Sequence, residues 1–215
     1  MPPRTPSQER RLRFFNQVIY ASMASGYNAL DWLTLGAWWR LVRRALRYVP
    51  RGRDVLEVGF GPGKLHAQLA KTARLCVGVD LAWGMCRFTQ LRLRRAGLPL
   101  RIVRGSVLEL PCRAEAFDVV VTTFAFSGFP DGMNALREMT RLTKPGGRVV
   151  MVDIGLPRDG NRAGMFWARV WERMGDFLYD QAAMMQAAGL EVVTYEEFGP
   201  GNHIRAVVGE KRFDK

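Results

Sequence analysis

Acidic and glycine residues in two short stretches have the types and spacing to bind a nucleoside ligand. The stretch VLEVGFGPGK places Glu57 inside a hydrophobic run and follows it with Gly59, Gly61 and Gly63. Asp80 ends a second hydrophobic run, 17 residues after Gly63. A carboxylate at the carboxyl edge of a parallel sheet can accept hydrogen bonds from both ribose hydroxyls. Glu57, inside a strand, requires a partner, either a cationic aminoacyl ligand or backbone amides of the turn.

Two phosphate-binding interpretations of the glycine stretch fail. The pattern GxxxxGK[ST] requires a glycine where Val58 stands and Ser or Thr where Leu65 follows the lysine. The dinucleotide pattern GxGxxG fails because the glycines follow GxGxG. A ligand with a ribose and a positively charged aminoacyl group therefore fits better than a pyrophosphate.

Alternating strands and helices must position these residues. Continuous β-branched runs separated by helical segments indicate an α/β fold with a parallel sheet covered on both faces. The expected strands are Val55–Gly59, Leu75–Leu81, Leu100–Arg104, Phe117–Thr123 and Arg148–Asp153. The expected helices are Lys64–Thr72, Ala82–Ala96 and Asn134–Leu142.

The end of the chain departs from this alternation. One helix is expected over Phe166–Ala188, ending at Gly189. Two strands, Glu191–Glu196 and His203–Glu210, then follow without a helix between them. They form a hairpin, so one of them must run antiparallel to the rest of the sheet.

The first part of the chain, residues 1–52, is expected to form a helical lid that also contacts a membrane, and residues 53–215 the α/β domain. Arginines lie opposite an apolar helical face that is made of Trp38, Leu41, Val42, Ala45, Leu46 and Val49. Residues 14–39 carry one charge, Asp31, but polar residues and a glycine interrupt them, which argues against a transmembrane helix. The alternative is a helix that only packs on the sheet.

Composition limits the remaining function classes. The 215 residues, 48% of them hydrophobic, suffice for one sizeable core. The net charge is +12, with ten arginines in residues 1–53 and six in residues 87–104, which suits a membrane surface, nucleic acid or simply a solvated basic face. The three cysteines lack CxxC spacing, so we expect reduced thiols, no metal and a cytoplasmic protein. The first seven residues lack the apolar region of a signal peptide.

Several motifs together resemble the class I S-adenosylmethionine-dependent methyltransferases. They are VLEVGFGPG, VGVD and RGSVLELPCRAEAFDVVVTTFAFSGFPDGMNALREMTRLTKPGGRVVMVD, which cover about residues 53–154. The resemblance implies a Rossmann-like, seven-stranded sheet of order 3-2-1-4-5-7-6 with strand 7 antiparallel. It also implies S-adenosyl-L-methionine as cofactor and S-adenosyl-L-homocysteine as product.

The resemblance assigns roles to ten residues. The three glycines would wrap the methionine moiety, Glu57 would support its ammonium indirectly, and Asp80 would hold the ribose. Leu81 would pack on the adenine, and Thr123 and Phe124 would face the methyl sulfonium. The family usually carries an acid after the third strand, where this chain has Ser106 and Val107 to meet the adenine.

The methyl acceptor leaves a weaker trace in the sequence. An activated methyl donor needs mainly alignment and exclusion of water, so no elaborate set of catalytic residues is required. Both histidines, His66 and His203, are expected to be structural. TTFAFSGFP stands where [DNS]PP[YFW] would indicate methylation of exocyclic nucleobase amines.

The first part of the chain favours a lipid-like acceptor. YNALDWLTLGAWWR resembles a segment of the ubiquinone/menaquinone-biosynthesis methyltransferases, and related phosphatidylethanolamine N-methyltransferases share the general plan. We therefore expect a prenylated quinol or a phospholipid amine as acceptor, and peripheral binding to the inner membrane face. Tyr20 and Tyr27 are the candidate catalytic residues. The alternatives are an RNA methyltransferase, although no RNA-binding module is visible, and a non-catalytic adenosine-ligand-binding protein.

Overall fold

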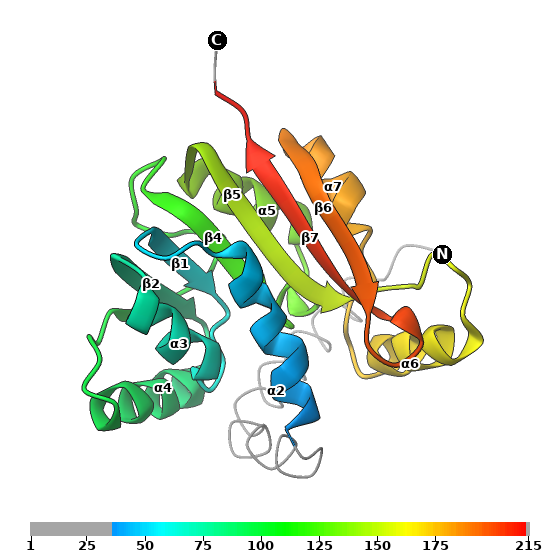
Figure 1. The fold of residues 1–215 in the computed structure, drawn as a ribbon, viewed down its shortest axis with the longest axis horizontal. Coiled ribbons are helices and arrows are strands. Elements are labelled where there is room, and N and C mark those ends of the chain that lie inside the picture. Colours follow the sequence, from blue (N-terminus) through cyan, green and yellow to red (C-terminus); the bar gives the residue numbers. More distant parts are fainter. Residues whose placement is uncertain (1–35, 214–215) are drawn as a thin grey trace.

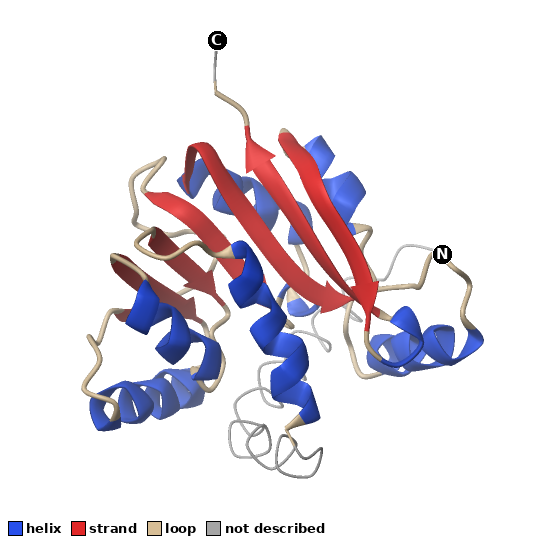
Figure 2. Cartoon of the chain, viewed as in Figure 1, coloured by secondary structure: helices blue, strands red, loops and turns tan. Residues whose placement is uncertain are grey.

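The computed structural model describes residues 36–213, which form one mixed sheet with helices on both faces (Figure 1, Figure 2). The strands are β1 (Asp54–Val58), β2 (Leu75–Asp80), β3 (Ile102–Arg104), β4 (Phe117–Thr123), β5 (Thr143–Ile154), β6 (Leu190–Phe198) and β7 (Ile204–Lys211). The α-helices are α2 (Ala37–Val42), α3 (Lys64–Thr72), α4 (Trp83–Arg95), α5 (Gly132–Leu142), α6 (Arg162–Arg173) and α7 (Gln181–Ala187). Short 3₁₀ helices are η1 (Arg43–Tyr48), η2 (Phe126–Gly128) and η3 (Pro200–Asn202).

The sheet has seven strands in the order β3-β2-β1-β4-β5-β7-β6, as the resemblance to the methyltransferases implied. Strands β1 to β5 pair in parallel, while β7 is antiparallel to both β5 and β6. The KPGG segment interrupts the pairing of β5 with β4, which passes from Thr143 directly to Arg148. The predicted hairpin therefore completes the sheet beside β5.

Two hydrophobic layers stabilise the sheet, one on each face. Successive residues of β4 alternate between them, with Val120 in one layer and Val119 and Val121 in the other. The first layer includes buried side chains of α5 and α7, and the second includes those of α3 and η1. Both faces of the central strands are thus buried, which explains their continuous hydrophobic runs.

The prediction of a single helix over Phe166–Ala188 is wrong. Helix α6 ends at Arg173 and α7 begins at Gln181. Gly175 has a φ of 112°, which a helix does not accommodate, and the side chain of Asp180 accepts a hydrogen bond from the backbone N–H of Ala183. The chain therefore turns between two separate amphipathic helices.

The described end of the first segment packs on the sheet. Helix α2 continues into the 3₁₀ helix η1, where Ala45 is fully buried in the second hydrophobic layer. The guanidinium of Arg44 lies 4.2 Å from the ring centroid of Phe198. Tyr20 and Tyr27 lie outside the described residues, and the lid at 1–52 stays a prediction.

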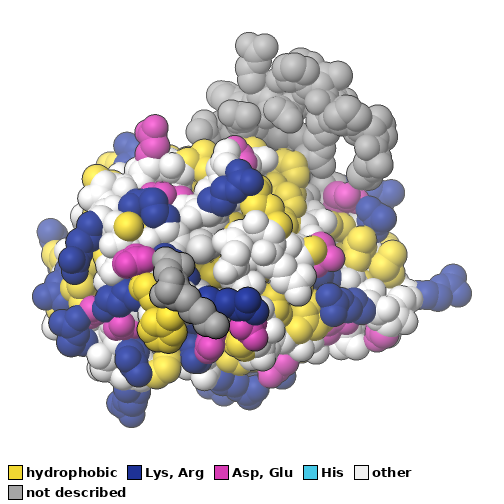
Figure 3. Space-filling model, turned by 90° about the horizontal axis from the view of Figure 1, so that it is seen from above, with side chains coloured by type: hydrophobic (Ala, Val, Ile, Leu, Met, Phe, Trp, Pro, Cys, Tyr) yellow, Lys and Arg dark blue, Asp and Glu magenta, His cyan; other side chains and the backbone are white. Residues whose placement is uncertain are grey.

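Charged pairs gather at the edge of the sheet where the parallel strands begin. The carboxylate of Asp54 pairs with Arg74 and with Lys144, whose Nζ lies 2.8 Å from Asp118. Figure 3 views this end of the molecule, and Lys and Arg side chains there are interspersed with Asp and Glu. Among residues 36–213, no helix is long and apolar enough to cross a bilayer.

Candidate functional site

The glycine loop between β1 and α3 forms a turn that requires glycine. Gly59, Gly61 and Gly63 have φ values of 70°, 52° and 73°, in the left-handed region that other residues rarely adopt. A Cβ on Gly59 would collide with Ala125, and one on Gly63 would collide with the side chain of Thr89. A Cβ on Gly61 would meet nothing within 4 Å. The loop is therefore packed tightly at both ends while its centre faces open space.

Asp80, at the end of β2, fixes this loop through its side chain. Its Oδ2 accepts a hydrogen bond of 2.8 Å from the backbone N–H of Gly61, and its Oδ1 accepts one of 2.8 Å from Ala82. Burial raises the pKa of the Asp80 carboxyl, while the two backbone hydrogen bonds oppose that rise. Each carboxylate oxygen can accept a further hydrogen bond, so the acid can still receive ribose hydroxyls.

Glu57 lies below the loop and is 1% exposed. Its Oε2 lies 3.0 Å from Nδ1 of His66, which is fully buried in α3. Burial raises the pKa of the Glu57 carboxyl, and the hydrogen bond from His66 lowers it. Sequence reasoning expected a ligand or backbone amides as partners and assigned His66 only a structural role. The nine-residue separation of Glu57 and His66 across a strand-to-helix turn is the signal that could have linked them.

Helix α4 supplies two contacts to the loop that the sequence did not predict. The hydroxyl of Thr89 donates a hydrogen bond of 2.9 Å to the carbonyl of Gly61. Nε of Arg92 donates one of 2.9 Å to the carbonyl of Pro62, and burial lowers the pKa of its guanidinium. The loop is thus fixed from β2 and from α4.

The residues directly after β3 carry no acid, and Ser106 and Val107 stand at the position where the resemblance implies contact with an adenine. The Ser106 hydroxyl accepts a hydrogen bond of 3.2 Å from the N–H of Leu108, and Val107 is buried. Leu81 is 53% exposed, so its side chain has a free apolar surface beside Asp80. The structure thus brings Leu81 and Ser106 to the same end of the neighbouring strands β2 and β3.

The end of β4 forms the aromatic side of the site. Phe124 has a φ of 49°, which is unusual for a non-glycine residue, and its N–H donates to the carbonyl of Val152 at 2.8 Å. Its ring centroid lies 4.3 Å from that of Trp38, which in turn lies 5.9 Å from that of Trp171 in α6. Thr123 is half-buried beside it. These three rings connect the sheet to the first segment of the chain and to α6.

A second buried acid, which the sequence analysis missed, lies at the end of β5. Asp153 is fully buried and accepts hydrogen bonds from the N–H groups of Ser127 and Ile154, at 3.0 and 2.8 Å. The Ser127 hydroxyl donates to Oδ1 of Asp176 at 2.9 Å. Burial raises the pKa of Asp153 to about 7, and the nearby charge of Asp176 adds to the rise. This acid anchors η2, the turn that follows Phe124.

Comparison with known proteins agrees with this geometry. Residues 56–151 match the family model described as a methyltransferase domain. The chain is 34% identical over 169 residues to the demethylmenaquinone methyltransferase of Roseiflexus castenholzii. The matched region covers 74% of this chain and 66% of that protein. The chain belongs to the class I S-adenosylmethionine-dependent methyltransferases. The cofactor of this class fits the open centre of the glycine loop and the unused acceptor capacity of Asp80.

The matches to other relatives cover a smaller share of those proteins. The demethylmenaquinone methyltransferase of Mycobacterium marinum is 35% identical over 122 residues, 56% of this chain and 49% of that protein. The chain thus spans about half the length of several curated relatives that it matches. Haemonchus contortus phospholethanolamine N-methyltransferase 2 has a similar fold, with a TM-score of 0.74 and 16% identity over 93% of this chain and 60% of that one.

Proposed function

We propose that this methyltransferase transfers a methyl group from S-adenosylmethionine to a lipophilic acceptor, a prenylated quinol, at a membrane surface. The observation that carries the proposal is the similarity to a demethylmenaquinone methyltransferase over 74% of the chain. The aromatic side of the site supports it, because Trp38, Phe124 and Trp171 offer an apolar environment for such a ring.

The cofactor would occupy the glycine loop. Its sulfonium supplies an activated methyl group, so this chain has to bind, orient and exclude water. In this proposal Asp80 accepts hydrogen bonds from the ribose, Leu81 covers the adenine, and Glu57 acts on the ammonium through the loop. The remaining contacts would come from Gly59, Gly61, Gly63, Ser106, Val107, Thr123 and Phe124.

The acceptor would lie on the other side of Phe124. Methyl transfer forms a bond from the acceptor to the methyl carbon, breaks the S–CH₃ bond and releases one proton from a neutral quinol. The rings of Trp38 and Trp171 would exclude water from that reaction. Tyr20 and Tyr27 remain candidates for orienting the acceptor from the segment outside the described residues.

A phospholipid amine is the second candidate acceptor. Its support is the fold of the Haemonchus contortus enzyme, whose structure contains phosphomonomethylethanolamine and S-adenosylhomocysteine. An RNA acceptor would bind the basic residues of this chain, whose net charge is +12. A protein that only binds an adenosine ligand would transfer no methyl group.

Transfer of a labelled methyl group separates these candidates. The full chain is incubated with labelled S-adenosylmethionine and, in separate reactions, a prenylated quinol, an aminophospholipid and total RNA. We expect label in the quinol, and a loss of at least about tenfold in Asp80→Asn, because a hydrogen bond to a charged group is lost. Label in the phospholipid or the RNA instead, or in none of the three, would contradict the quinol assignment.

A further inference from the structure

Helix α6 presents large apolar side chains to solvent. Phe166 is 60% exposed, Trp167 46% and Met174, directly after the helix, 51%. The rings of Phe166 and Trp167 lie edge to face, with centroids 5.5 Å apart. Large apolar side chains are usually buried. Their grouping on the outer side of α6 therefore indicates a surface that another molecule contacts.

The opposite face of α6 holds the helix firmly on the protein. Gly164 and Ala168 are buried, and a Cβ on Gly164 would collide with the backbone of Gly201 in η3. The side chain of Asn161 accepts a hydrogen bond of 3.1 Å from the N–H of Gly164 and caps the helix. The exposed rings therefore stand on a fixed support, and burying them requires no rearrangement of the core.

Basic side chains lie among these apolar residues. Arg162, Arg169 and Arg173 are exposed, while Glu172, the one acid of the helix, pairs with Arg169 at 2.7 Å. Three arginines against one glutamate leave the helix with a charge of +2. Aromatic rings beside arginines suit a bilayer interface, where the rings enter the headgroup layer and the guanidiniums meet anionic lipids.

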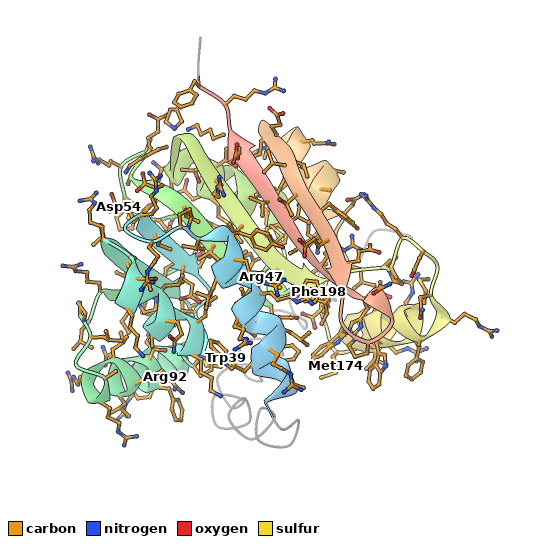
Figure 4. All side chains as sticks on the ribbon, viewed as in Figure 1. Trp39, Arg47, Asp54, Arg92, Met174 and Phe198 are labelled. Carbon is orange, nitrogen blue, oxygen red and sulfur yellow. The ribbon has the colours of Figure 1, made fainter. Side chains whose placement is uncertain are left out.

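The position of α6 connects this surface to the candidate site. Trp171, on the same helix, is in ring contact with Trp38, which is in ring contact with Phe124 at the end of β4. In Figure 4 Met174 lies toward the same edge of the molecule as Arg92, which binds the glycine loop, and away from Asp54 at the other edge. A bilayer on α6 would thus lie next to the acceptor side.

We propose that the outer face of α6 binds the surface of an anionic lipid bilayer through Phe166, Trp167 and Met174, together with Arg162 and Arg173. The charge of the helix and the interfacial preference of aromatic rings favour a bilayer over a second copy of this basic chain, which would bring like charges together. The purpose of this docking, delivery of a lipophilic acceptor, rests on the proposed function. The binding itself does not.

Flotation with vesicles of phosphatidylcholine and phosphatidylglycerol tests the proposal on the full chain. We expect the triple variant Phe166→Ser, Trp167→Ser, Met174→Ser to bind at least about tenfold more weakly, because three interfacial side chains are lost. The variant Arg162→Gln, Arg173→Gln should lose binding to these vesicles and not to pure phosphatidylcholine. No methyl acceptor is present, so the result is independent of the enzyme's reaction.

Matched variants at the other end of the molecule provide the controls. Phe213 is 73% exposed beyond β7, and Phe213→Ser should bind vesicles as the unchanged chain does. Arg113→Gln, Arg212→Gln removes two arginines distant from α6 and should reduce binding less than Arg162→Gln, Arg173→Gln. Melting temperature and S-adenosylhomocysteine affinity verify that each variant is folded.

Depth-dependent quenching by brominated lipids locates the contact. Trp167→Phe should lose most of the quenching seen with the unchanged chain. The proposal is overturned if the unchanged chain does not float, if the triple variant floats equally well, or if Trp83→Phe on α4 abolishes quenching instead. It is also overturned if the unchanged chain is a dimer that the triple variant dissociates, because α6 would then be a protein interface.

Discussion

Glu57 and His66 form a buried hydrogen-bonded pair below the glycine loop. Their side chains are almost fully buried, and among the described residues Nε2 of His66 has no hydrogen-bond partner. Gly78 lies so close to the His66 ring that a Cβ there would collide with it. The ring is thus held in place by packing, and its hydrogen bond to Glu57 favours the ionised carboxylate. His66 is therefore a positioning residue for the acid below the glycine loop.

Replacing His66 tests that role. In His66→Leu the Glu57 carboxyl loses its partner, and we expect its pKa to rise further and cofactor affinity to fall about tenfold near neutral pH. His66→Gln keeps a hydrogen-bond donor and should recover much of the affinity. Isothermal titration with S-adenosylhomocysteine across pH measures both variants. An affinity that is equally weak in both and independent of pH would indicate a purely structural role.

The buried Asp153 predicts a pH dependence of stability. Its pKa in the folded protein is about 7, above the usual 3.8. Between these two pH values the folded state holds a proton that the unfolded chain has lost. The free energy of unfolding should therefore fall as pH rises from about 4 to 7, by up to about 4 kcal/mol from this group. Urea unfolding of Asp153→Asn should show a shallower decline over that range.

Asp118 provides a control of opposite sign. Burial acts to raise its pKa, but hydrogen bonds from Lys144 and from the N–H of Asp54 hold that pKa below its usual range. The ionised Asp118 therefore stabilises the folded state above its usual pKa, and this stabilisation is lost as the pH falls. Asp118→Asn should leave the decline between pH 4 and 7 unchanged. A decline that is equally steep in Asp153→Asn would show that other groups cause it.

At the scale of elements, strands were easier to predict than helix ends. The strand β4 was predicted with its observed bounds because its apolar run is continuous and buried on both faces. The break between α6 and α7 was missed because the apolar pattern continues through Gly175, whose φ of 112° only the structure reveals. The charge and the hydrophobic periodicity of an amphipathic segment do not reveal one residue with a positive φ inside it. The helix break at this residue could therefore not be predicted.

The residues of the candidate site that belong to sequence motifs were predictable. The residues that reach the glycine loop from α4 were not. The structure places the three glycines and Asp80 together, as the motif predicted, although their cofactor contacts stay a proposal. Thr89 and Arg92 reach the loop from α4, 28 and 30 residues away from the carbonyls they bind. Those contacts depend on how α4 packs, which sequence spacing does not encode.

The packing of α4 on the loop can be tested at Gly63. In Gly63→Ala the new Cβ would strain a φ of 73° and also collide with Thr89. We expect a loss of about 2–4 kcal/mol in unfolding free energy, from about 1–2 kcal/mol of left-handed strain plus overpacking, and weaker cofactor binding.

Gly52→Ala is the matched control for this variant. Gly52 has a φ of 74°, and a Cβ at this position would meet nothing within 4 Å, so only the backbone strain of about 1–2 kcal/mol applies. Thr89→Ala in the Gly63→Ala background should recover part of the difference, measured by urea unfolding as a double-mutant cycle. Equal losses in Gly63→Ala and Gly52→Ala would rule out the steric contact with α4.

At the scale of the whole molecule, positive charge is distributed unevenly. Acids pair with the basic residues where the parallel strands begin, as around Asp54 and Asp118. By contrast α4 carries four arginines and no acid, and α6 carries a charge of +2. In Figure 1 both helices lie at the edge toward which the arrows of β1 and β5 point. Part of the positive excess within the described residues therefore lies near the candidate site, where a long-range field would draw the protein to an anionic surface.

This distribution predicts that salt weakens vesicle binding strongly and S-adenosylhomocysteine binding only slightly. The Debye length shortens from about 30 Å at 0.01 M salt to about 3 Å at 1 M, so long-range attraction is screened. Binding to phosphatidylglycerol vesicles should fall at least about tenfold between roughly 0.05 and 0.5 M salt. The affinity for S-adenosylhomocysteine should change less than about twofold, because in the proposed site it would be held by short hydrogen bonds inside the loop. Removing the three apolar side chains of α6 should lower vesicle binding at every salt concentration and leave the slope unchanged, since charge and apolar burial act separately. A slope that disappears with those side chains, or cofactor affinity as salt-sensitive as vesicle binding, would contradict a separate long-range electrostatic contribution.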